Sequence, residues 1–282
     1  MKRVVLLCVL AWGMPWLVAA ESLRVVTADG AITETVYLLG MESHLVAVDS
    51  TSRYPDAVRT LPTVGYLRAL PFEGVLAVRP DLLITSEQAA PQDNLERLAR
   101  AGVRVEKLPS AWTIKTALAR VEAVGQLLGR SEHAEAIVAQ LQSHTNEVRN
   151  AALKRGTRPR VLFILAAGNH SVMLAGEDTA AAALLETVNA RNAVTGVQGY
   201  KPANREAMLA LNPDAIVIAE STPGQFDIGA WPELARLGAW QSGHYLVADS
   251  MFLLGFGPRL PQAMAAVNRV LPSATHALAH GS

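Results

Sequence analysis

The 282-residue sequence has one cysteine and few charged residues. The cysteine, Cys8, lies in a segment that we expect to be removed from the mature protein. A mature chain without thiols can form neither a disulfide bond nor a thiolate metal site. Charged residues make up 18% of the chain and the formal net charge is zero. This balance does not favour binding to nucleic acid or to an anionic membrane surface, and we expect neither partner.

Long hydrophobic runs are missing after the N-terminal segment, so no later segment is expected to span a bilayer. The N-terminal segment begins with Lys2 and Arg3, continues with an apolar run, and ends in small residues. This order is typical of a secretory signal peptide over residues 1–20, with cleavage after Ala20. The apolar run is too short and too interrupted for a membrane anchor. We therefore expect an exported protein located in the periplasm.

Half of the residues are hydrophobic, which is enough for large buried cores. Short apolar stretches that predict strands alternate with helical patterns in residues 21–111 and again in residues 157–282. Between them, residues 112–156 predict two helices, of which the second would be about 35 Å long. We predict an α/β fold of two similar lobes with parallel sheets, joined by a long rigid helix. Ligands of such folds bind in a cleft between the lobes, at the carboxyl ends of the strands.

A short pattern occurs once in each of the two α/β parts. Starting at Glu73 and again at Glu206, a glutamate is followed by helical residues, a Pro-Asp turn and an apolar strand. A glutamate in the first turn of a helix is stabilised by the helix dipole, so the pattern alone assigns no function to either residue. Its occurrence at corresponding places supports two similar lobes.

The segment around Tyr66 suggests a binding site. In an extended segment, Tyr66 and Arg68 would point to the same side of the chain. A phenolate is a hard oxygen donor that suits ferric iron, and tyrosinate is one of the axial ligands of haem iron. A neighbouring cation favours the phenolate. A core tyrosine beside a solvated arginine would give the same residues, so the pattern alone leaves both interpretations open.

Two segments resemble a known family. Thr63-Val64-Gly65-Tyr66-Leu67-Arg68-Ala69-Leu70, followed by Glu73-Gly74-Val75-Leu76-Ala77, resembles the haem-ligand segment of the periplasmic haem-binding proteins of bacterial haem ABC importers. Leu254-Gly255-Phe256-Gly257-Pro258-Arg259 resembles a loop in the second lobe of the same family. The order of elements is similar over residues 22–272. The wider fold resembles the vitamin B12 and ferric siderophore binders.

The resemblance implies specific roles for four residues. Tyr66 would be the axial ligand of ferric haem, and Arg68 would support it through a hydrogen bond. Glu73 and Glu206 would each bind arginines on one of the two permease subunits of an ABC importer. The protein would carry haem as transported cargo rather than as a catalytic cofactor. We expect it to be a monomer without enzymatic activity.

The second lobe departs from the family at one position. Some members have a haem-ligating histidine after the strand that corresponds to residues 161–165, and that histidine can bind a second haem. The aligned residue here is Ala167, and His170 lies three positions further on. His170 is therefore retained as a candidate cofactor-binding residue, and the number of bound haems stays open.

Other candidates in the second lobe are mostly apolar. Met251, Phe252, Leu254 and Phe256 could form an apolar wall for the porphyrin on a loop facing the cleft. Arg259 is a candidate partner for a haem propionate because a guanidinium group suits a carboxylate. The same apolar residues would also be expected in a hydrophobic core.

Three alternative functions are consistent with parts of the sequence. A ferric siderophore or cobalamin binder would keep the fold but would not need a tyrosinate ligand. An exported hydrolase using a cleft carboxylate or His170 belongs to another class, although no nucleophile elbow or phosphate loop is recognisable. A haem-scavenging buffer would bind the same ligand without a transporter.

Overall fold

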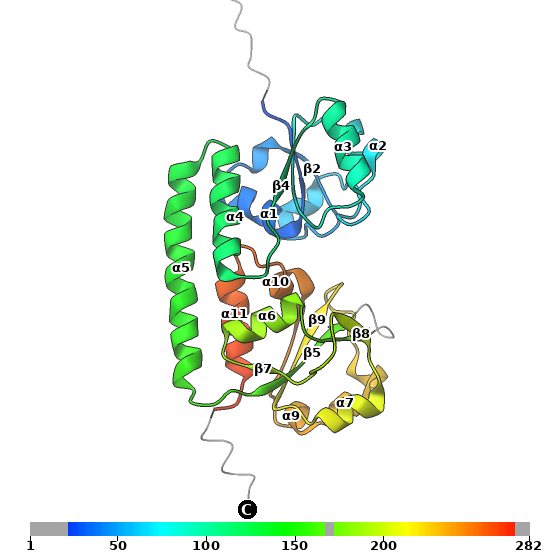
Figure 1. Cartoon of the computed structure of the whole chain (residues 1–282), viewed down its shortest axis with the longest axis vertical. Coiled ribbons are helices and arrows are strands. Elements are labelled where there is room, and N and C mark those ends of the chain that lie inside the picture. The colour runs from blue at the N-terminus through cyan, green and yellow to red at the C-terminus, as the bar shows by residue number, and fades with distance from the viewer. Residues whose placement is uncertain (1–21, 167–171, 274–282) are drawn as a thin grey trace, which may run out of the picture.

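The computed structural model describes residues 22–166 and 172–273. Two lobes lie one above the other, and one long helix runs along one side of both (Figure 1). We call them the N-lobe, which contains β1–β4, and the C-lobe, which contains β5–β10. The predicted signal peptide, residues 1–20, and the candidate ligand His170 lie outside the described residues.

The N-lobe is built on a four-stranded parallel sheet of order β2-β1-β3-β4. Its central strands, β1 and β3, are buried on both faces, which explains their continuous apolar runs. Helices α2 and α3 cover one face, and α1, α4 and α5 cover the other. The elements are β1 (Val25–Ala28), α1 (Gly30–Leu38), η1 (Glu42–His44), β2 (Leu45–Val48), η2 (Asp56–Thr60), α2 (Phe72–Ala77), β3 (Leu82–Ser86), α3 (Gln92–Arg100) and β4 (Arg104–Leu108).

The C-lobe sheet has the order β10-β9-β5-β6-β8, and β7 pairs with β5 beside this path. One face carries α6, α10 and α11, and the other carries α7, α8 and α9. The elements are β5 (Arg160–Ala166), β6 (Val172–Ala175), α6 (Ala180–Thr187), β7 (Arg191–Asn192), β8 (Tyr200–Pro202), α7 (Arg205–Leu211), β9 (Ala215–Glu220), η3 (Ile228–Ala230), α8 (Pro232–Ala235), α9 (Gly238–Gln241), β10 (Tyr245–Asp249), α10 (Ser250–Leu254) and α11 (Leu260–Val270).

The predicted parallel sheets with helices on both faces are confirmed for the N-lobe and for β10-β9-β5. The prediction missed the antiparallel strands β6 and β8, which extend the C-lobe sheet beyond β5. β6 is apolar but only four residues long, and the three-residue β8 contains a lysine and a proline, so neither was recognised as a strand of the sheet. The omission matters because β8 carries a residue of the cavity described below.

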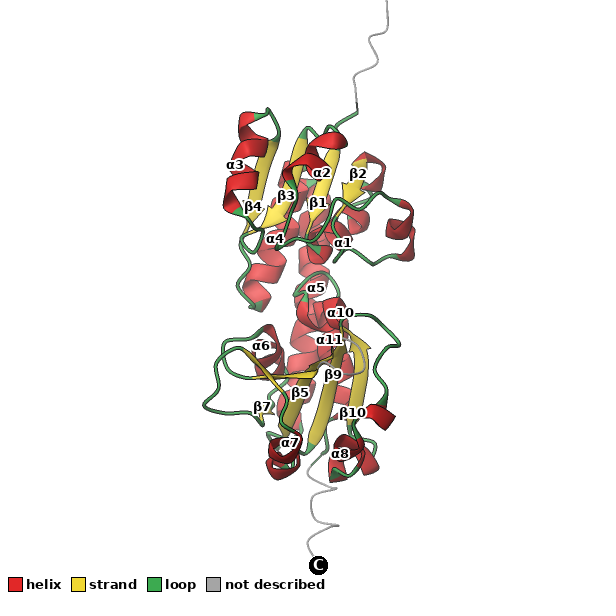
Figure 2. Cartoon of the chain, turned by 90° about the vertical axis from the view of Figure 1, so that its right-hand side faces the viewer, coloured by secondary structure: helices red, strands yellow, loops and turns green. Residues whose placement is uncertain are grey.

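Two helices connect the lobes: α4 (Ile114–Leu127) and the 24-residue α5 (Ser131–Lys154). The Thr113 side chain caps α4 by accepting a hydrogen bond from the Thr116 backbone N–H at 3.0 Å. Ile137 of α5 packs into the N-lobe core, whereas Ala152 packs into the C-lobe core. A single helix therefore serves both cores, which confirms the predicted long connecting helix. Figure 2 shows both sheets in front of α4, α5 and α11.

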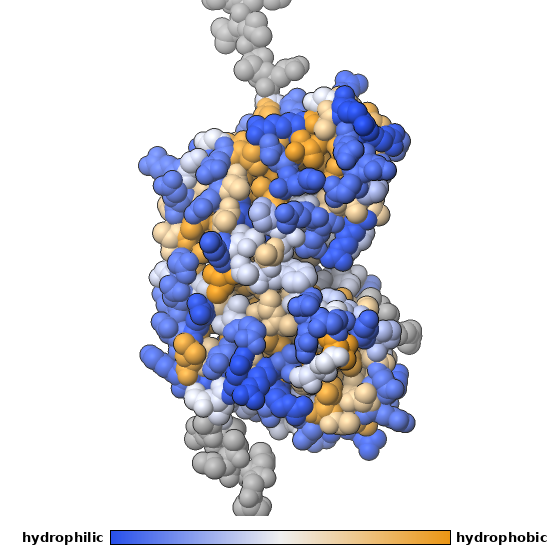
Figure 3. All heavy atoms as spheres, viewed as in Figure 1, coloured by the Kyte–Doolittle hydropathy of each residue, from blue (hydrophilic) through white to orange (hydrophobic). Residues whose placement is uncertain are grey.

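The surface in the first view is largely hydrophilic, with small apolar patches scattered over both lobes (Figure 3). Within residues 22–166 and 172–273, no helix combines the length and the hydropathy needed to span a membrane. The largest fully buried side chains belong to the two sheets and the helices packed on them, for example Phe163 of β5 and Ile32 of α1. The apolar half of the sequence is thus used mainly to hold each sheet between its helices.

Candidate functional site

A cavity of about 630 Å³ lies between the two lobes. It is lined by residues that follow β1, β2 and β3 of the N-lobe and by residues at the ends of β5, β9 and β10 of the C-lobe. The carboxyl ends of both parallel sheets therefore face the same space, as expected for a binding cleft in this type of fold. Trp112 and Arg120 of the connecting segment complete the lining.

Tyr66 reaches the cavity from a tight turn of the N-lobe. Its backbone carbonyl accepts a hydrogen bond from the Ala69 N–H at 2.8 Å. The segment is therefore folded back, whereas the prediction assumed an extended one. Gly65 has φ +121°, and a Cβ there would lie 2.6 Å from Cδ of Pro71. Only glycine fits this combination of backbone angle and close approach. The tyrosine side chain remains 46% exposed, which distinguishes it from a core residue.

The buried carboxylate of Asp49, just after β2, holds the Tyr66 turn in place. It accepts hydrogen bonds from the Leu67 backbone N–H at 3.3 Å and from the hydroxyls of Thr51 and Ser52 at 2.9 Å each. Burial raises the pKa of Asp49 above its ordinary value, while the hydrogen bonds from Thr51 and Ser52 oppose this rise. Sequence analysis missed Asp49, although an acidic residue at the end of an apolar strand is a recognisable signal.

Arg68 lines the same cavity, but the predicted contact between its guanidinium and the Tyr66 phenol is not formed. Its Nη2 donates instead to Oε1 of Gln88 at 2.5 Å. In the part of the chain that the structure describes, no hydrogen bond joins Arg68 to Tyr66. The turn at Tyr66 is the physical reason, because the two side chains no longer follow the alternation of an extended strand.

Tyr200 of β8 faces the cavity from the C-lobe and was not predicted. Burial raises the pKa of its phenol above the ordinary value. Hydrogen bonds with the Ala181 backbone and the Thr179 side chain, together with the charge of Arg68, act in the opposite direction.

Arg53, on the loop after β2, was also missed by sequence analysis. Its Nη1 donates to the backbone carbonyl of Ser221, just after β9, at 2.8 Å. Its Nε donates to the carbonyl of Ser50 at 3.4 Å. Arg53 is half-buried, lines the cavity, and joins the N-lobe to the C-lobe. No local pattern marks it, because its main partner is 168 positions away in the sequence.

The apolar residues predicted in the C-lobe have different positions. Met251 and Leu254 line the cavity, but they lie on helix α10 and not on a loop. Phe252 packs against the C-lobe core, and Phe256 is only 2% exposed within that core. The predicted apolar wall therefore consists of two of the four side chains.

Arg259 does not line the cavity, in contrast to its predicted role as a propionate partner. Its Nε donates to Oε2 of Glu34 at 2.8 Å, and its Nη2 pairs with the other oxygen of the same carboxylate. The guanidinium group lies over the rings of Tyr54, at 4.1 Å, and Phe252, at 5.2 Å. Burial raises the pKa of Glu34 above its ordinary value, and the hydrogen bond and charge of Arg259 oppose this rise.

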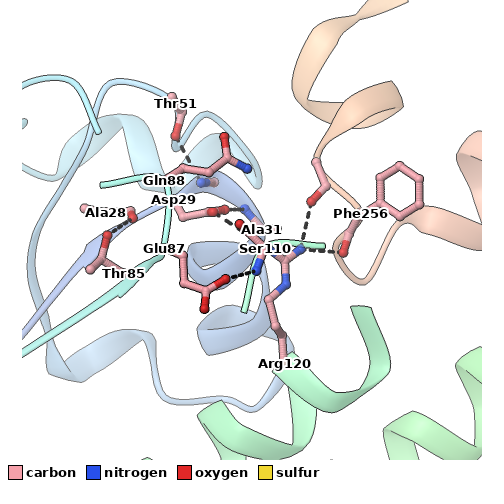
Figure 4. Close-up of polar contacts among 12 residues, drawn as sticks. Ala28, Asp29, Ala31, Thr51, Thr85, Glu87, Gln88, Ser110, Arg120 and Phe256 are labelled. Carbon is pink, nitrogen blue, oxygen red and sulfur yellow. Dashed lines mark hydrogen bonds and ion pairs between the residues drawn. The ribbon is translucent and has the colours of Figure 1, made fainter. Parts of the chain in front are cut away.

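Arg120 forms a second bridge behind the cavity (Figure 4). The residue is 6% exposed and extends from α4 between the lobes. Its guanidinium donates to the carbonyls of Gly255, at 2.8 Å, and Phe256, at 2.5 Å, and lies 3.8 Å from the carboxylate of Asp29. The pairs Arg120–Asp29 and Arg259–Glu34, with the residues that they contact, form what we call the lobe junction.

The glycine of the Phe256-Gly257-Pro258 sequence also belongs to the lobe junction. A Cβ at Gly257 would lie 2.7 Å from Cβ of Ala31 in α1. The second segment that carried the family resemblance is therefore needed for close packing of the lobes, and only Leu254 and Gly255 at its start line the cavity.

The two glutamates predicted to bind a permease belong to α2 and α7, helices that lie on the side of the molecule away from α5 (Figure 1). Glu73 is in the first turn of α2, and Glu206 is in the first turn of α7. Both are exposed. Oε1 of Glu73 lies 3.5 Å from Nη2 of Arg97, whereas Glu206 forms no ion pair with any residue in the described ranges.

Solved structures of similar fold include two named as haem-binding proteins. A periplasmic haem-binding protein from Pseudomonas aeruginosa is 38% identical, with a TM-score of 0.78, and the alignment covers 88% of this chain and 92% of that chain. The periplasmic haem-binding protein BhuT, solved in complex with two haems, is 33% identical with a TM-score of 0.78, covering 88% of this chain and 97% of that chain.

Curated relatives are more distant and more varied. YvrC of Bacillus subtilis, a substrate-binding lipoprotein of an ABC transporter, is 26% identical over 203 residues, covering 71% of this chain and 64% of its own length. The vitamin B12-binding protein of Pectobacterium atrosepticum is 27% identical over 217 residues, covering 76% of this chain and 75% of its own length. The B12-binding relative keeps a second ligand class open.

A family model provides the broadest match. Residues 25–251 match the model of the periplasmic binding protein family, which spans both lobes. The similar proteins above are binding proteins rather than enzymes, in agreement with the prediction that the chain has no catalytic activity. Fold, cavity and family match lead to one conclusion: this chain belongs to the periplasmic binding protein family.

Proposed function

We propose that the protein captures ferric haem in the cavity between the lobes, with the Tyr66 phenolate as an axial ligand of the iron. The observation that carries this proposal is the exposed Tyr66 side chain, which enters a cavity of about 630 Å³ from a fixed turn. Small-molecule sites have volumes of about 300–1,000 Å³, so the cavity has a suitable size. The haem-binding proteins at 38% and 33% identity support the same ligand class.

The chemistry of the lining fits a metalloporphyrin. Tyr66 offers a hard oxygen donor, which ferric iron prefers. Arg53 and Arg68 place positive charge on the same wall, which favours an anionic ligand atom and acidic groups on the cargo. Met251 and Leu254 supply apolar contacts on the opposite wall for the flat face of the ring. One or two haems would both be consistent with these contacts, because His170 lies outside the described residues.

An absorption titration with ferric haem tests the proposal. The mature protein should give a saturable Soret band with the charge-transfer features of tyrosinate-ligated ferric haem. The Tyr66→Ala variant should lose these features and most of its affinity. The break in the titration gives the number of haems. A wild-type protein without a saturable spectral change would overturn the haem proposal.

A cobalamin or ferric siderophore is the second candidate cargo, favoured by the B12-binding relatives. Neither needs a tyrosinate on its metal. If this candidate is correct, cyanocobalamin or a ferric siderophore should bind both wild type and Tyr66→Ala, with similar affinity. Running these ligands beside haem in the same titration separates the two candidates.

We also propose delivery to an inner-membrane ABC importer, with Glu73 and Glu206 docking on the two permease subunits. The two glutamates are in the first turns of α2 and α7, and these helices lie on one side of the molecule, which suits a two-subunit partner. Replacing both by lysine should abolish haem-dependent growth while leaving haem binding by the purified protein unchanged. Normal growth of the double variant would support a haem buffer without a transporter.

A further inference from the structure

Two arginines of the cavity lining form no ion pair with a carboxylate in the described ranges, and the lining acid Asp249 accepts a hydrogen bond from the Phe252 backbone N–H instead. Among the charged lining residues, Arg120 is paired with Asp29 at 3.8 Å. Arg53 and Arg68 form no ion pair with any acidic residue in the described ranges. Arg68 donates to the neutral amide of Gln88, and Arg53 donates to two backbone carbonyls.

Arg53 is the better placed of these two arginines to receive an acidic group. It is half-buried, so water screens its charge less than that of the exposed Arg68. Its acceptors are the carbonyls of Ser221 and Ser50, and the second hydrogen bond is long, at 3.4 Å. A carboxylate is a stronger acceptor for guanidinium than a neutral carbonyl and can take two parallel hydrogen bonds. A cargo carboxylate would therefore compete well for this side chain.

The position of Arg53 relative to Tyr66 is fixed by one buried group. The carboxylate of Asp49 accepts hydrogen bonds from Thr51 and Ser52, directly before Arg53, and from the backbone N–H of Leu67, directly after Tyr66. The loop that carries the cation and the turn that carries the phenol are thus held by the same acceptor. A cargo that contacts both the Tyr66 phenol and the Arg53 guanidinium would carry a metal at its centre and an acidic group at its edge.

We infer that Arg53 is the cargo-carboxylate receptor of this cavity and a determinant of its specificity. This inference rests on the proposed function, since it assumes that Tyr66 binds the cargo metal. It assigns the cargo to metal chelates with a peripheral carboxylate, such as an iron porphyrin with free propionates. The edge of a corrin ring carries neutral amides in place of acids, so Arg53 selects against cobalamin. The role predicted for Arg259 passes to Arg53, because Arg259 is already bound to Glu34.

The test compares ferric haem with its dimethyl ester, whose two carboxylates are blocked, in wild type and Arg53→Gln. Both ligands are titrated in the same low concentration of detergent. We expect Arg53→Gln to weaken haem binding about 10- to 100-fold, as for a lost hydrogen bond between charged groups. The ester should bind wild type and Arg53→Gln with equal affinity. Arg53→Lys should keep part of the preference for free haem.

Arg59→Gln is the matched control. Arg59 is a largely exposed arginine of the neighbouring η2 that pairs with Asp56 and does not line the cavity. It should leave both affinities unchanged, and thermal unfolding should show that all variants are folded. Equal loss of both ligands in Arg53→Gln, or loss of neither, would overturn the inference while the Tyr66-dependent Soret band still supports haem binding. A wild-type protein that binds neither ligand would instead overturn the proposed function.

Discussion

The two walls of the cavity are made of different chemistry. The N-lobe wall carries Tyr66, Arg53 and Arg68 on loops, and the buried Asp49 fixes two of these positions. The C-lobe wall is largely apolar and carries Met251 and Leu254 on the short helix α10. Its polar lining residues are Tyr200, Ser221, Asp249 and Ser250, and among the described residues it contributes no cation. The comparison suggests that the N-lobe determines which metal and charge are accepted, and that the C-lobe determines shape.

The largest expected effect comes from removing the phenol oxygen of Tyr66, compared with removing that of Tyr200. Tyr66→Phe should lower haem affinity by at least about 100-fold, since even groups that only support a metal ligand contribute about 10- to 100-fold. Tyr200→Phe should change affinity only a few-fold, because its oxygen is engaged by the C-lobe itself. Absorption titrations measure both. A larger effect for Tyr200→Phe would reverse the assignment of the two walls.

The next effect concerns one acid on each side of the cavity, the buried Asp49 of the N-lobe and the cavity-lining Asp249 of the C-lobe. Asp49→Asn should lower the free energy of unfolding by about 1–3 kcal/mol, because an amide cannot satisfy all the buried donors around it. Asp249→Asn should cost less than about 1 kcal/mol, since Asp249 caps α10 through one hydrogen bond, to the Phe252 N–H, which an amide oxygen can also accept. Urea unfolding measures both values. Equal costs would mean that the Tyr66 turn does not depend on Asp49.

A smaller effect is expected on the apolar wall. Met251→Ala removes part of the surface that would cover a porphyrin face and should weaken haem binding about fivefold, which corresponds to about 1 kcal/mol. The absorption features of the tyrosinate ligand should stay unchanged. A shifted spectrum at full saturation would show that the C-lobe wall also influences the iron ligand.

The smallest effect is on the pH dependence of stability. Burial raises the pKa values of Asp49 and Glu34, so the folded protein binds more protons than the unfolded chain between the ordinary and the raised values. The resulting stability is fully present below the ordinary values and is lost as pH rises through the raised ones. Lowering pH through this window should therefore raise the free energy of unfolding. Glu34→Gln should reduce this rise, and parallel curves for wild type and variant would contradict the assignment.

Local sequence patterns predicted most of the fold and only part of the site. The apolar strands and Pro-Asp turns are contiguous in the chain, so the lobes and the connecting helix could be predicted. Tyr66 could be found because its glycine and its neighbours lie in one segment. Arg259 was misplaced because its partner Glu34 is 225 positions away. Tyr200 was missed with β8, whose pairing with β6 is not visible in the sequence of either strand.

The lobe junction has a consequence for how fast cargo enters and how it leaves. Because Arg120 and Arg259 join the two lobes behind the cavity, we expect no closing movement of the lobes before the cargo binds. The rate of haem uptake should then rise linearly with haem concentration, without the plateau of a slow closing step. In the proposed delivery step, the two lobes would rotate relative to each other about the lobe junction. A membrane partner that moves α2 and α7 apart would open the cavity and release the cargo, and its binding would supply the free energy for this opening.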